Sequence, residues 1–144
     1  MGRCGTLGET AELAFRFAGT LKPGDIVLLC GELGAGKTTF TRSMAEALGI
    51  QPDIVSSPTF TLMNVYPGQI DLVHVDFYRL LDGGDIFFDE LEEMADGTRI
   101  IVIEWGDRFL DQIRDSAPGR LFLVRFSMIS DEERDIQVEE DSHH

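Results

Sequence analysis

Positively charged residues are scarce in this chain. Its 144 residues include 12 Lys and Arg against 26 Asp and Glu, which gives a formal net charge of −14 at pH 7. Only two of the cations are lysines, Lys22 and Lys37. Nucleic-acid backbones and anionic lipid surfaces are bound mainly through clustered cations. We therefore expect no strong direct binding of nucleic acid and no docking on a membrane.

Long apolar runs and cysteine clusters are also missing. No stretch approaches the roughly 18 apolar residues of a membrane span, and residues 1–5 lack the apolar run and cleavage site of a secretory signal. The two cysteines, Cys4 and Cys30, form no C-x-x-C pair, which argues against a disulfide scaffold and against a structural zinc site. The cytoplasm is the expected location.

The remaining composition is that of a soluble globular domain. Hydrophobic residues make up 43% of the chain and charged residues 26%. The length corresponds to one domain and is sufficient to bury a core. No internal repeat, low-complexity block or linker divides the sequence. We therefore predict a single domain over residues 1–144, in which about residues 128–144 form a variable acidic tail.

Strands and helices are predicted to alternate along the chain. Residues 26–30 are apolar at every position, which is typical of a strand covered on both faces. Strands at 59–65 and 72–77 have a connection too short for a parallel crossover, so they form an antiparallel hairpin. The other expected elements are helices over 8–19, 38–48, 84–95 and 105–113, and strands over 99–104, 121–126 and, at the sheet edge, 135–138. This order predicts an α/β fold, a three-layer sandwich with a mixed, mostly parallel sheet that contains a β-hairpin.

The strongest motif is the run Gly31-Glu32-Leu33-Gly34-Ala35-Gly36-Lys37-Thr38, which fits G-x4-G-K-[ST] in full. It follows an apolar strand and opens a helix, as a phosphate-binding loop requires. Backbone N–H groups of such a loop surround an anion, and the helix N-terminus adds positive partial charge. The predicted nucleotide-binding residues are Gly34, Ala35, Gly36, Lys37, Thr38 and Thr39. Lys37 is expected to reach the β- and γ-phosphates and the Thr38 hydroxyl to bind Mg²⁺, so we predict a P-loop NTPase domain. The alternative is a glycine-rich strand–helix turn with an exposed lysine.

A phosphate-binding loop also needs an acidic residue near the magnesium ion. Glu104 ends the apolar run 100–103, which follows a helix and can therefore run parallel to the strand before the loop. Asp76 ends the run 72–75, which belongs to the hairpin. On this geometry Glu104 is the better candidate to hold the metal. Either acid could instead be a solvated residue at a strand end, and His74 on the hairpin strand is more typical of a core histidine than of a ligand.

The base of the nucleotide is predicted by a missing motif. A guanine-specific GTPase would carry N-K-x-D, but Asn64 is the sole asparagine and precedes Val65. ATP is therefore the expected nucleotide. Trp105, which follows Glu104, lies either near the nucleotide or in ordinary packing.

Several short motifs accompany the loop in a fixed order. They are Gly24-Asp25, the run 31–39, Ser57-Pro58-Thr59-Phe60-Thr61, His74-Val75-Asp76-Phe77-Tyr78-Arg79, Glu90-Leu91 and Glu104-Trp105. With this set the chain resembles the TsaE (YjeE) family, bacterial ATPases required for threonylcarbamoyladenosine modification of tRNA. The resemblance extends from the helix near Thr10 to the strand at Leu121. The loop alone would not single out this family.

The resemblance implies specific roles. By similarity, Thr38 and Glu104 hold Mg²⁺, and Asp76 lies close to the metal and is needed for hydrolysis. Lys37, Asp76 and Glu104 are thus the expected catalytic residues, with ATP or ADP and Mg²⁺ as cofactors. Residues 56–61 would act as a switch, and backbone near 6–10 would contact adenine. The chain has Glu32 where the family often has Asp, a small departure that leaves the match of the loop intact.

The resemblance also implies partners, the TsaB and TsaD proteins. In the family, TsaD transfers threonylcarbamoyl to tRNA, and ATP hydrolysis resets the complex between turnovers. Because of the acidic charge, we expect no strong direct binding of tRNA by this chain.

Two other functions are considered. A small-molecule kinase would need an arginine-bearing lid, for which Arg108, Arg114 or Arg120 could serve, but no long inserted segment is available. A nucleotide-dependent binding module with negligible turnover has the same sequence features, because the positioning of water cannot be read from them.

Overall fold

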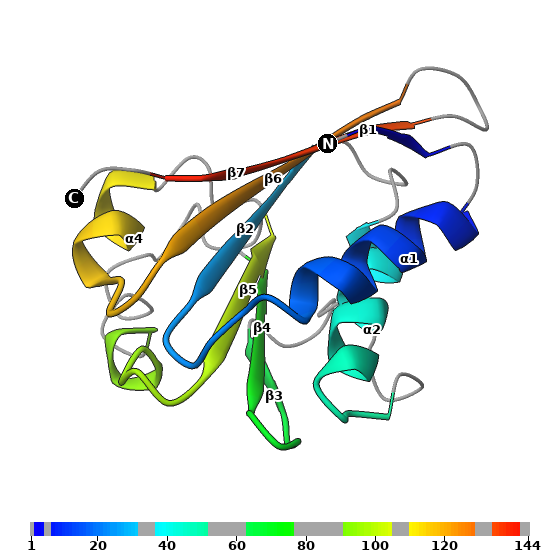
Figure 1. Cartoon of the computed structure of the whole chain (residues 1–144). Helices are drawn as coiled ribbons and strands as arrows, with labels where there is room; N and C mark the ends of the chain where they lie inside the picture. The colour runs from blue at the N-terminus through cyan, green and yellow to red at the C-terminus, as the bar shows by residue number, and fades with distance from the viewer. Residues whose placement is uncertain are drawn as a thin grey trace.

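Seven strands form one sheet in the computed structural model of this chain (Figure 1). The structure describes residues 2–4, 7–31, 37–51, 63–76, 91–104, 110–128 and 134–141. The helices are α1 (Leu7–Ala18), α2 (Lys37–Ala47) and α4 (Leu110–Ser116), and residues 91–94 are also helical. The strands are β1 (Gly2–Cys4), β2 (Ile26–Gly31), β3 (Met63–Tyr66), β4 (Leu72–Asp76), β5 (Ile100–Glu104), β6 (Leu121–Met128) and β7 (Arg134–Glu140).

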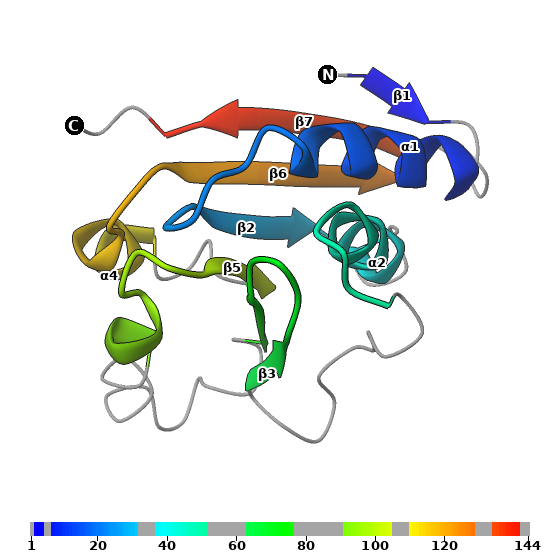
Figure 2. The same ribbon diagram turned by 60° about the horizontal axis from the view of Figure 1, so that its bottom comes forward.

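The four central strands, β6, β2, β5 and β4, run parallel to one another, and their neighbours β7 and β3 run antiparallel to them. The strand order is β1-β7-β6-β2-β5-β4-β3 (Figure 2). Strand β2 pairs in parallel with β5 and β6, and β5 pairs in parallel with β4. Antiparallel pairs join β3 to β4, β7 to β6 and β1 to β7. The predicted mixed sheet is therefore confirmed, and its hairpin is β3–β4.

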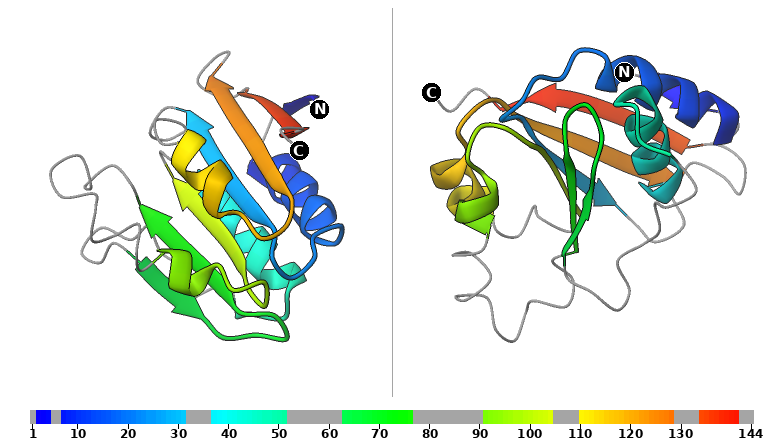
Figure 3. Two further views of the ribbon diagram at one scale, coloured as in Figure 1. Left: turned by 90° about the vertical axis from the view of Figure 1, so that its left-hand side faces the viewer. Right: turned by 90° about the horizontal axis from the view of Figure 1, so that it is seen from below.

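Helices cover both faces of the sheet, as the three-layer prediction requires. Figure 3 shows α1 and α2 on one face, with α4 and the helical residues 91–94 on the other. Val27 and Leu29 of β2 pack into the core with α1 and α2, whereas Ile26 and Leu28 pack into the core with α4. All four side chains are fully buried, which explains why this strand is apolar at every position.

Helix α2 ends at Ala47, and a glycine follows two residues later. Gly49 has φ +80°, a left-handed conformation that favours glycine. The Ile50 N–H donates to the Ala45 carbonyl at 2.9 Å and the Gly49 N–H donates to the Glu46 carbonyl at 3.1 Å. This pair of bonds is the Schellman arrangement that ends many helices.

The last strand differs from its prediction. It runs over Arg134–Glu140 rather than 135–138, and it is not at the sheet edge, because β1 pairs with its outer side. The Asp141 N–H donates to the Leu121 carbonyl at 2.7 Å, so the pairing with β6 continues one residue past the strand. Three residues of β1 carry no recognisable strand pattern, and only backbone pairing with a distant segment makes them a strand.

Other differences are smaller. Helix α4 spans Leu110–Ser116, whereas 105–113 was predicted, and residues 105–109 lie outside the described part. Of the helix predicted over 84–95, the described residues show the part at 91–94. Within the ranges that the structure describes, no helix has both the length and the apolar character needed to cross a bilayer.

Candidate functional site

The glycine-rich segment runs from the middle strand of the sheet to a helix. Strand β2 ends at Gly31 and α2 begins at Lys37. The motif is therefore preceded by a strand and followed by a helix, as phosphate-binding loops require. Residues 32–36 lie outside the described part of the chain, so the roles predicted for residues 34–36 stay predictions.

The first glycine of the motif is required by a close approach to the neighbouring strand. Gly31 has φ +141°, and a Cβ at this position would lie 2.5 Å from the carbonyl oxygen of Phe126 on β6. No side chain fits there unless one of the two strands moves. Glycine at this position therefore allows β2 and β6 to pair closely at the point where the glycine-rich segment begins.

The lysine of the motif is buried rather than exposed. Lys37 is 4% exposed, and its Nζ donates to the Gly31 carbonyl oxygen at 3.0 Å. The ammonium group is therefore directed back toward the end of β2. Because a buried cation is costly unless polar groups surround it, this arrangement differs from the exposed lysine of a plain strand–helix turn.

The two predicted acidic residues lie side by side at the same end of the sheet. Glu104, the last residue of β5, pairs in register with Leu29 of β2 and with Asp76 of β4. Parallel strands present their carboxyl ends at one edge, and ligands of open α/β sheets bind in the crevice outside that edge. The fold thus brings Glu104 and the backbone of Asp76 to the end of the sheet where β2 leads into the glycine-rich segment.

The structure describes only part of the predicted metal site. The side chains of Thr38 and Asp76 lie outside the described part, so their roles stay predictions, whereas Thr39 is half-buried on α2. Glu104 is 5% exposed. It is therefore the predicted metal ligand whose side-chain environment can be examined.

Glu104 has a partner that the sequence did not predict. Its Oε2 lies 2.7 Å from Nε2 of His74 on β4, and the His74 side chain is completely buried. The ring of Tyr66 lies near the imidazole, with centroids 6.2 Å apart. The expectation of a core histidine holds in that the ring is buried, but the ring also contacts the candidate metal ligand. The two residues are 30 positions apart, and only the β4–β5 register brings them together.

These residues fit a magnesium ion that also binds nucleotide phosphates. Mg²⁺ usually takes one or two protein oxygens and completes its octahedral shell with waters and phosphate oxygens. Among the described residues, no group of three or more His, Cys, Asp or Glu side chains could hold a metal by itself. A magnesium ion that is also bound by phosphates and waters needs only one or two protein oxygens. The single buried carboxylate of Glu104, at the end of a strand beside β2, can supply one of them.

The arginines considered for a kinase lid are engaged elsewhere. The guanidinium of Arg120 donates to the buried Asp25 and to the Thr20 carbonyl, and the hydrogen bond that it donates to Asp25 raises the pKa of Arg120. Arg114 binds Asp141, which raises the Arg114 pKa. Arg120 precedes β6 and its carbonyl accepts from the first residue of β2, so it lies at the opposite end of the strand from Gly31. Arg108 lies outside the described part.

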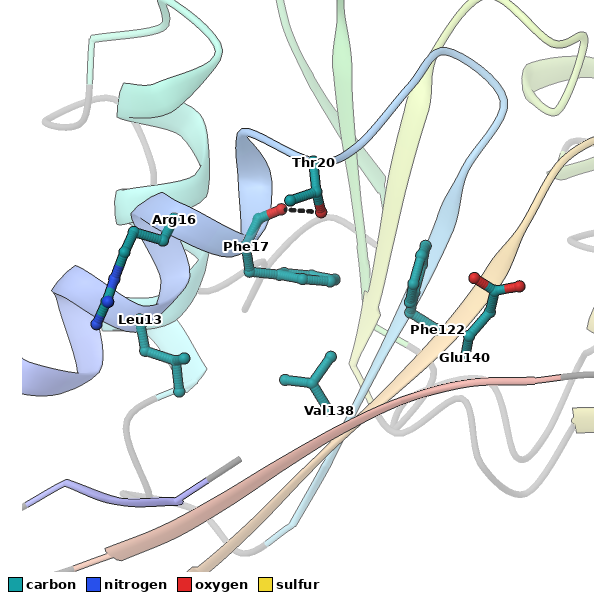
Figure 4. Close-up of a pocket in the computed structure, with 7 residues that line it drawn as sticks. All are labelled: Leu13, Arg16, Phe17, Thr20, Phe122, Val138 and Glu140. Carbon is teal, nitrogen blue, oxygen red and sulfur yellow. Dashed lines mark hydrogen bonds between the residues drawn. The ribbon is translucent and has the colours of Figure 1, made fainter.

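A pocket of about 510 Å³ lies between α1 and the strands β6 and β7 (Figure 4). It is lined by Leu13, Arg16, Phe17, Thr20, Phe122, Val138 and Glu140. Phe122 pairs with Val27, whereas Phe126 pairs with Gly31. Four strand residues correspond to about 13 Å, so this pocket is separate from the candidate nucleotide site.

Together the fold and the motif place the chain among three-layer α/β domains with a glycine-rich segment after the middle strand. The chain is a three-layer α/β domain in which a G-x4-G-K-[ST] segment connects the middle parallel strand to a helix, with a buried acid at the end of the adjoining strand. A family model described as "Threonylcarbamoyl adenosine biosynthesis protein TsaE" matches residues 4–136. The chain therefore belongs to the TsaE family.

Individual relatives agree with this assignment. The chain is 41% identical over 130 residues to a protein named tRNA threonylcarbamoyladenosine biosynthesis protein TsaE from Treponema pallidum, covering 90% of this chain and 93% of that protein. It is 39% identical over 129 residues to the protein of the same name from Bacillus subtilis, covering 89% and 77%. The crystal structure of YdiB from Bacillus subtilis matches with a TM-score of 0.68 and 32% identity, over 94% of this chain and 84% of that one.

Proposed function

We propose that this chain is a magnesium-dependent ATPase that supports threonylcarbamoyladenosine modification of tRNA. Membership of the TsaE family supports the pathway. The main support for ATPase activity is the position of Glu104. This residue is buried at the end of β5 and is in register with β2, the strand that leads into the motif containing Lys37. Glu104, Lys37 and the Gly31 end of β2 are thus at one end of the sheet, which supports binding of ATP·Mg there.

Each residue has a defined task in this proposal. Lys37 leaves the Gly31 carbonyl and binds the β- and γ-phosphate oxygens, while backbone N–H groups of the glycine-rich segment hold the remaining oxygens. Thr38 and Glu104 would hold Mg²⁺, and the bound ion would neutralise charge on the phosphates. Asp76, beside Glu104 in the register, orients the attacking water.

The partners in this proposal are TsaB and TsaD, and they hold the tRNA. A chain with a net charge of −14 is repelled by a polyanion at long range. ATP binding and hydrolysis would then alter contact with the partners through residues 56–61 and reset the complex between turnovers.

Reconstitution tests this function. The chain is mixed with TsaB, TsaD, tRNA and a preformed activated threonylcarbamoyl donor. Modification of the tRNA is measured with and without ATP, and hydrolysis is measured in the mixtures that contain ATP. We expect modification over repeated turnovers to need both this chain and ATP, and the chain alone to give no gel shift with tRNA near physiological salt. Modification that proceeds equally without this chain would contradict the proposal. ATP binding without turnover in the full mixture would support the binding-module alternative.

A further inference from the structure

His74 and Glu104 form a hydrogen-bonded pair of polar side chains inside the protein, where apolar contacts between strands are usual. The His74 side chain is fully buried and the Glu104 side chain is 7% exposed. Between the described residues, the 2.7 Å contact with His74 is the one hydrogen bond of the Glu104 carboxyl group. One carboxylate oxygen is thus held, and the other is left without a side-chain partner in the described part of the chain.

The location of the imidazole proton follows from the other ring nitrogen. His74 Nδ1 is buried and has no hydrogen-bond partner among the described residues. A proton on Nδ1 would be an unpaired buried donor, which is unfavourable. We therefore place the proton on Nε2, which donates it to Glu104 Oε2. This tautomer is assigned from the hydrogen-bond network.

We propose that His74 is a positioning residue that fixes Glu104 for Mg²⁺. The inference rests on the proposed function and adds a residue to it. His74 Nε2–H binds Oε2 of Glu104, so the carboxylate cannot rotate freely and Oε1 is the oxygen that remains for the metal. Mg²⁺ demands near-ideal octahedral geometry, so a carboxylate that is already oriented binds it at lower cost.

The surroundings of His74 make it suited to this task. Its strand neighbours Val73 and Val75 are fully buried in the core on the α4 side, which holds the backbone of β4 in place. Its own ring is packed near Tyr66, so the imidazole has little freedom. The same strand ends at Asp76, which pairs in register with Glu104. Strand β4 therefore supplies both the predicted water-orienting acid and the group that holds the metal ligand.

Two amide variants test the position of the donor. In His74→Gln the amide nitrogen lies near the position of Nε2, whereas in His74→Asn it lies near that of Nδ1. His74→Leu removes the donor. Binding of ADP is measured by calorimetry for wild type and variants, once with Mg²⁺ and once with EDTA, and thermal unfolding is recorded for each protein.

The expected result is a loss that is specific to the metal. All variants bind ADP in EDTA as wild type does, because His74 does not contact the nucleotide in this proposal. The increase in ADP affinity caused by Mg²⁺ is strongly reduced in His74→Asn and His74→Leu, because removing a group that orients a metal ligand usually lowers metal affinity by about 10- to 100-fold. His74→Gln keeps most of the increase. If His74→Leu does not fold, the difference between His74→Gln and His74→Asn in the Mg²⁺ effect still tests the role of Nε2.

Three results would overturn the inference. The Mg²⁺ effect could be unchanged in every variant, it could fall equally in His74→Gln and His74→Asn, or the variants could lose ADP binding in EDTA to the same extent, as a purely structural role predicts. A wild-type protein whose ADP binding does not respond to Mg²⁺ would instead contradict the magnesium site of the proposed function. The two failures are therefore distinguishable.

Discussion

Lys37 donates a hydrogen bond from Nζ to the carbonyl oxygen of Gly31 at 3.0 Å, so the seventh residue of the eight-residue motif contacts the first. Gly31 ends β2 and Lys37 begins α2, so this bond connects the two elements on either side of the glycine-rich segment. The lysine is 4% exposed in this position. A phosphate group that binds here would compete with a backbone carbonyl for an ammonium group that is already at the site.

The first prediction compares the chain's two lysines. Lys37→Ala should weaken binding of ADP and ATP by about tenfold or more, because a charge-assisted hydrogen bond is lost. Lys22→Ala is the matched control, since Lys22 is exposed in a turn and its backbone N–H, which the substitution keeps, donates to Asp25 at 2.8 Å. Calorimetric titration with both nucleotides measures the effect. Equal affinities in the two variants would contradict the role of Lys37.

The second prediction separates the two acids. Glu104→Gln should reduce the dependence of nucleotide binding on Mg²⁺, because a carboxylate oxygen is replaced by a weaker ligand. Asp76→Asn should keep nucleotide binding and lose hydrolysis, because an amide orients the attacking water poorly. Binding and phosphate release are measured for both variants over a range of Mg²⁺ concentrations. Normal hydrolysis by Asp76→Asn would show that Asp76 is a structural residue.

The third prediction concerns the close approach of β2 and β6. Gly31→Ala adds a Cβ 2.5 Å from the Phe126 carbonyl oxygen and forces alanine into positive φ. Gly97→Ala is the control, because Gly97 has φ +91° but no atom within 4 Å of an added Cβ. Both variants carry the conformational strain of a positive φ, about 1–3 kcal/mol, and only Gly31→Ala adds the close contact with Phe126. Gly31→Ala should therefore lower the free energy of unfolding by more than Gly97→Ala does. Urea unfolding of the two variants tests this order, and equal losses would show that the strands separate without cost.

The fourth prediction concerns a buried acid far from the glycine-rich segment. Asp25 is 2% exposed and accepts hydrogen bonds from the Lys22 N–H and from the backbone and guanidinium of Arg120. Asp25→Ala should lower the free energy of unfolding by about 1.5–3 kcal/mol, the range for hydrogen bonds to a charged group. Asp111, whose side chain is 91% exposed in its ion pair with Arg114, is the control. Its replacement by alanine should leave stability nearly unchanged in the same urea experiment.

Local features of the sequence were sufficient to predict the central part of the fold. The apolar run at 26–30, the glycine-rich segment and the helix that ends at Gly49 are consecutive, so each follows from signals within a few residues of itself. The hairpin followed from its short connection in the same way. Glu104 and Asp76 were predicted as acids at the ends of apolar runs, but their position side by side was not predicted, because it depends on the parallel pairing of β4 with β5.

The tertiary structure decided the contacts between segments that are far apart in the chain. The bond from His74 to Glu104 depends on the β4–β5 register, because a shift of one residue would turn the imidazole to the other face of the sheet. The requirement for glycine at position 31 arises from Phe126 on β6, and the strand β1 exists because β7 offers it a backbone edge. Sequence patterns report the surroundings of a residue along the chain, whereas these relationships depend on which strands become neighbours when the sheet forms.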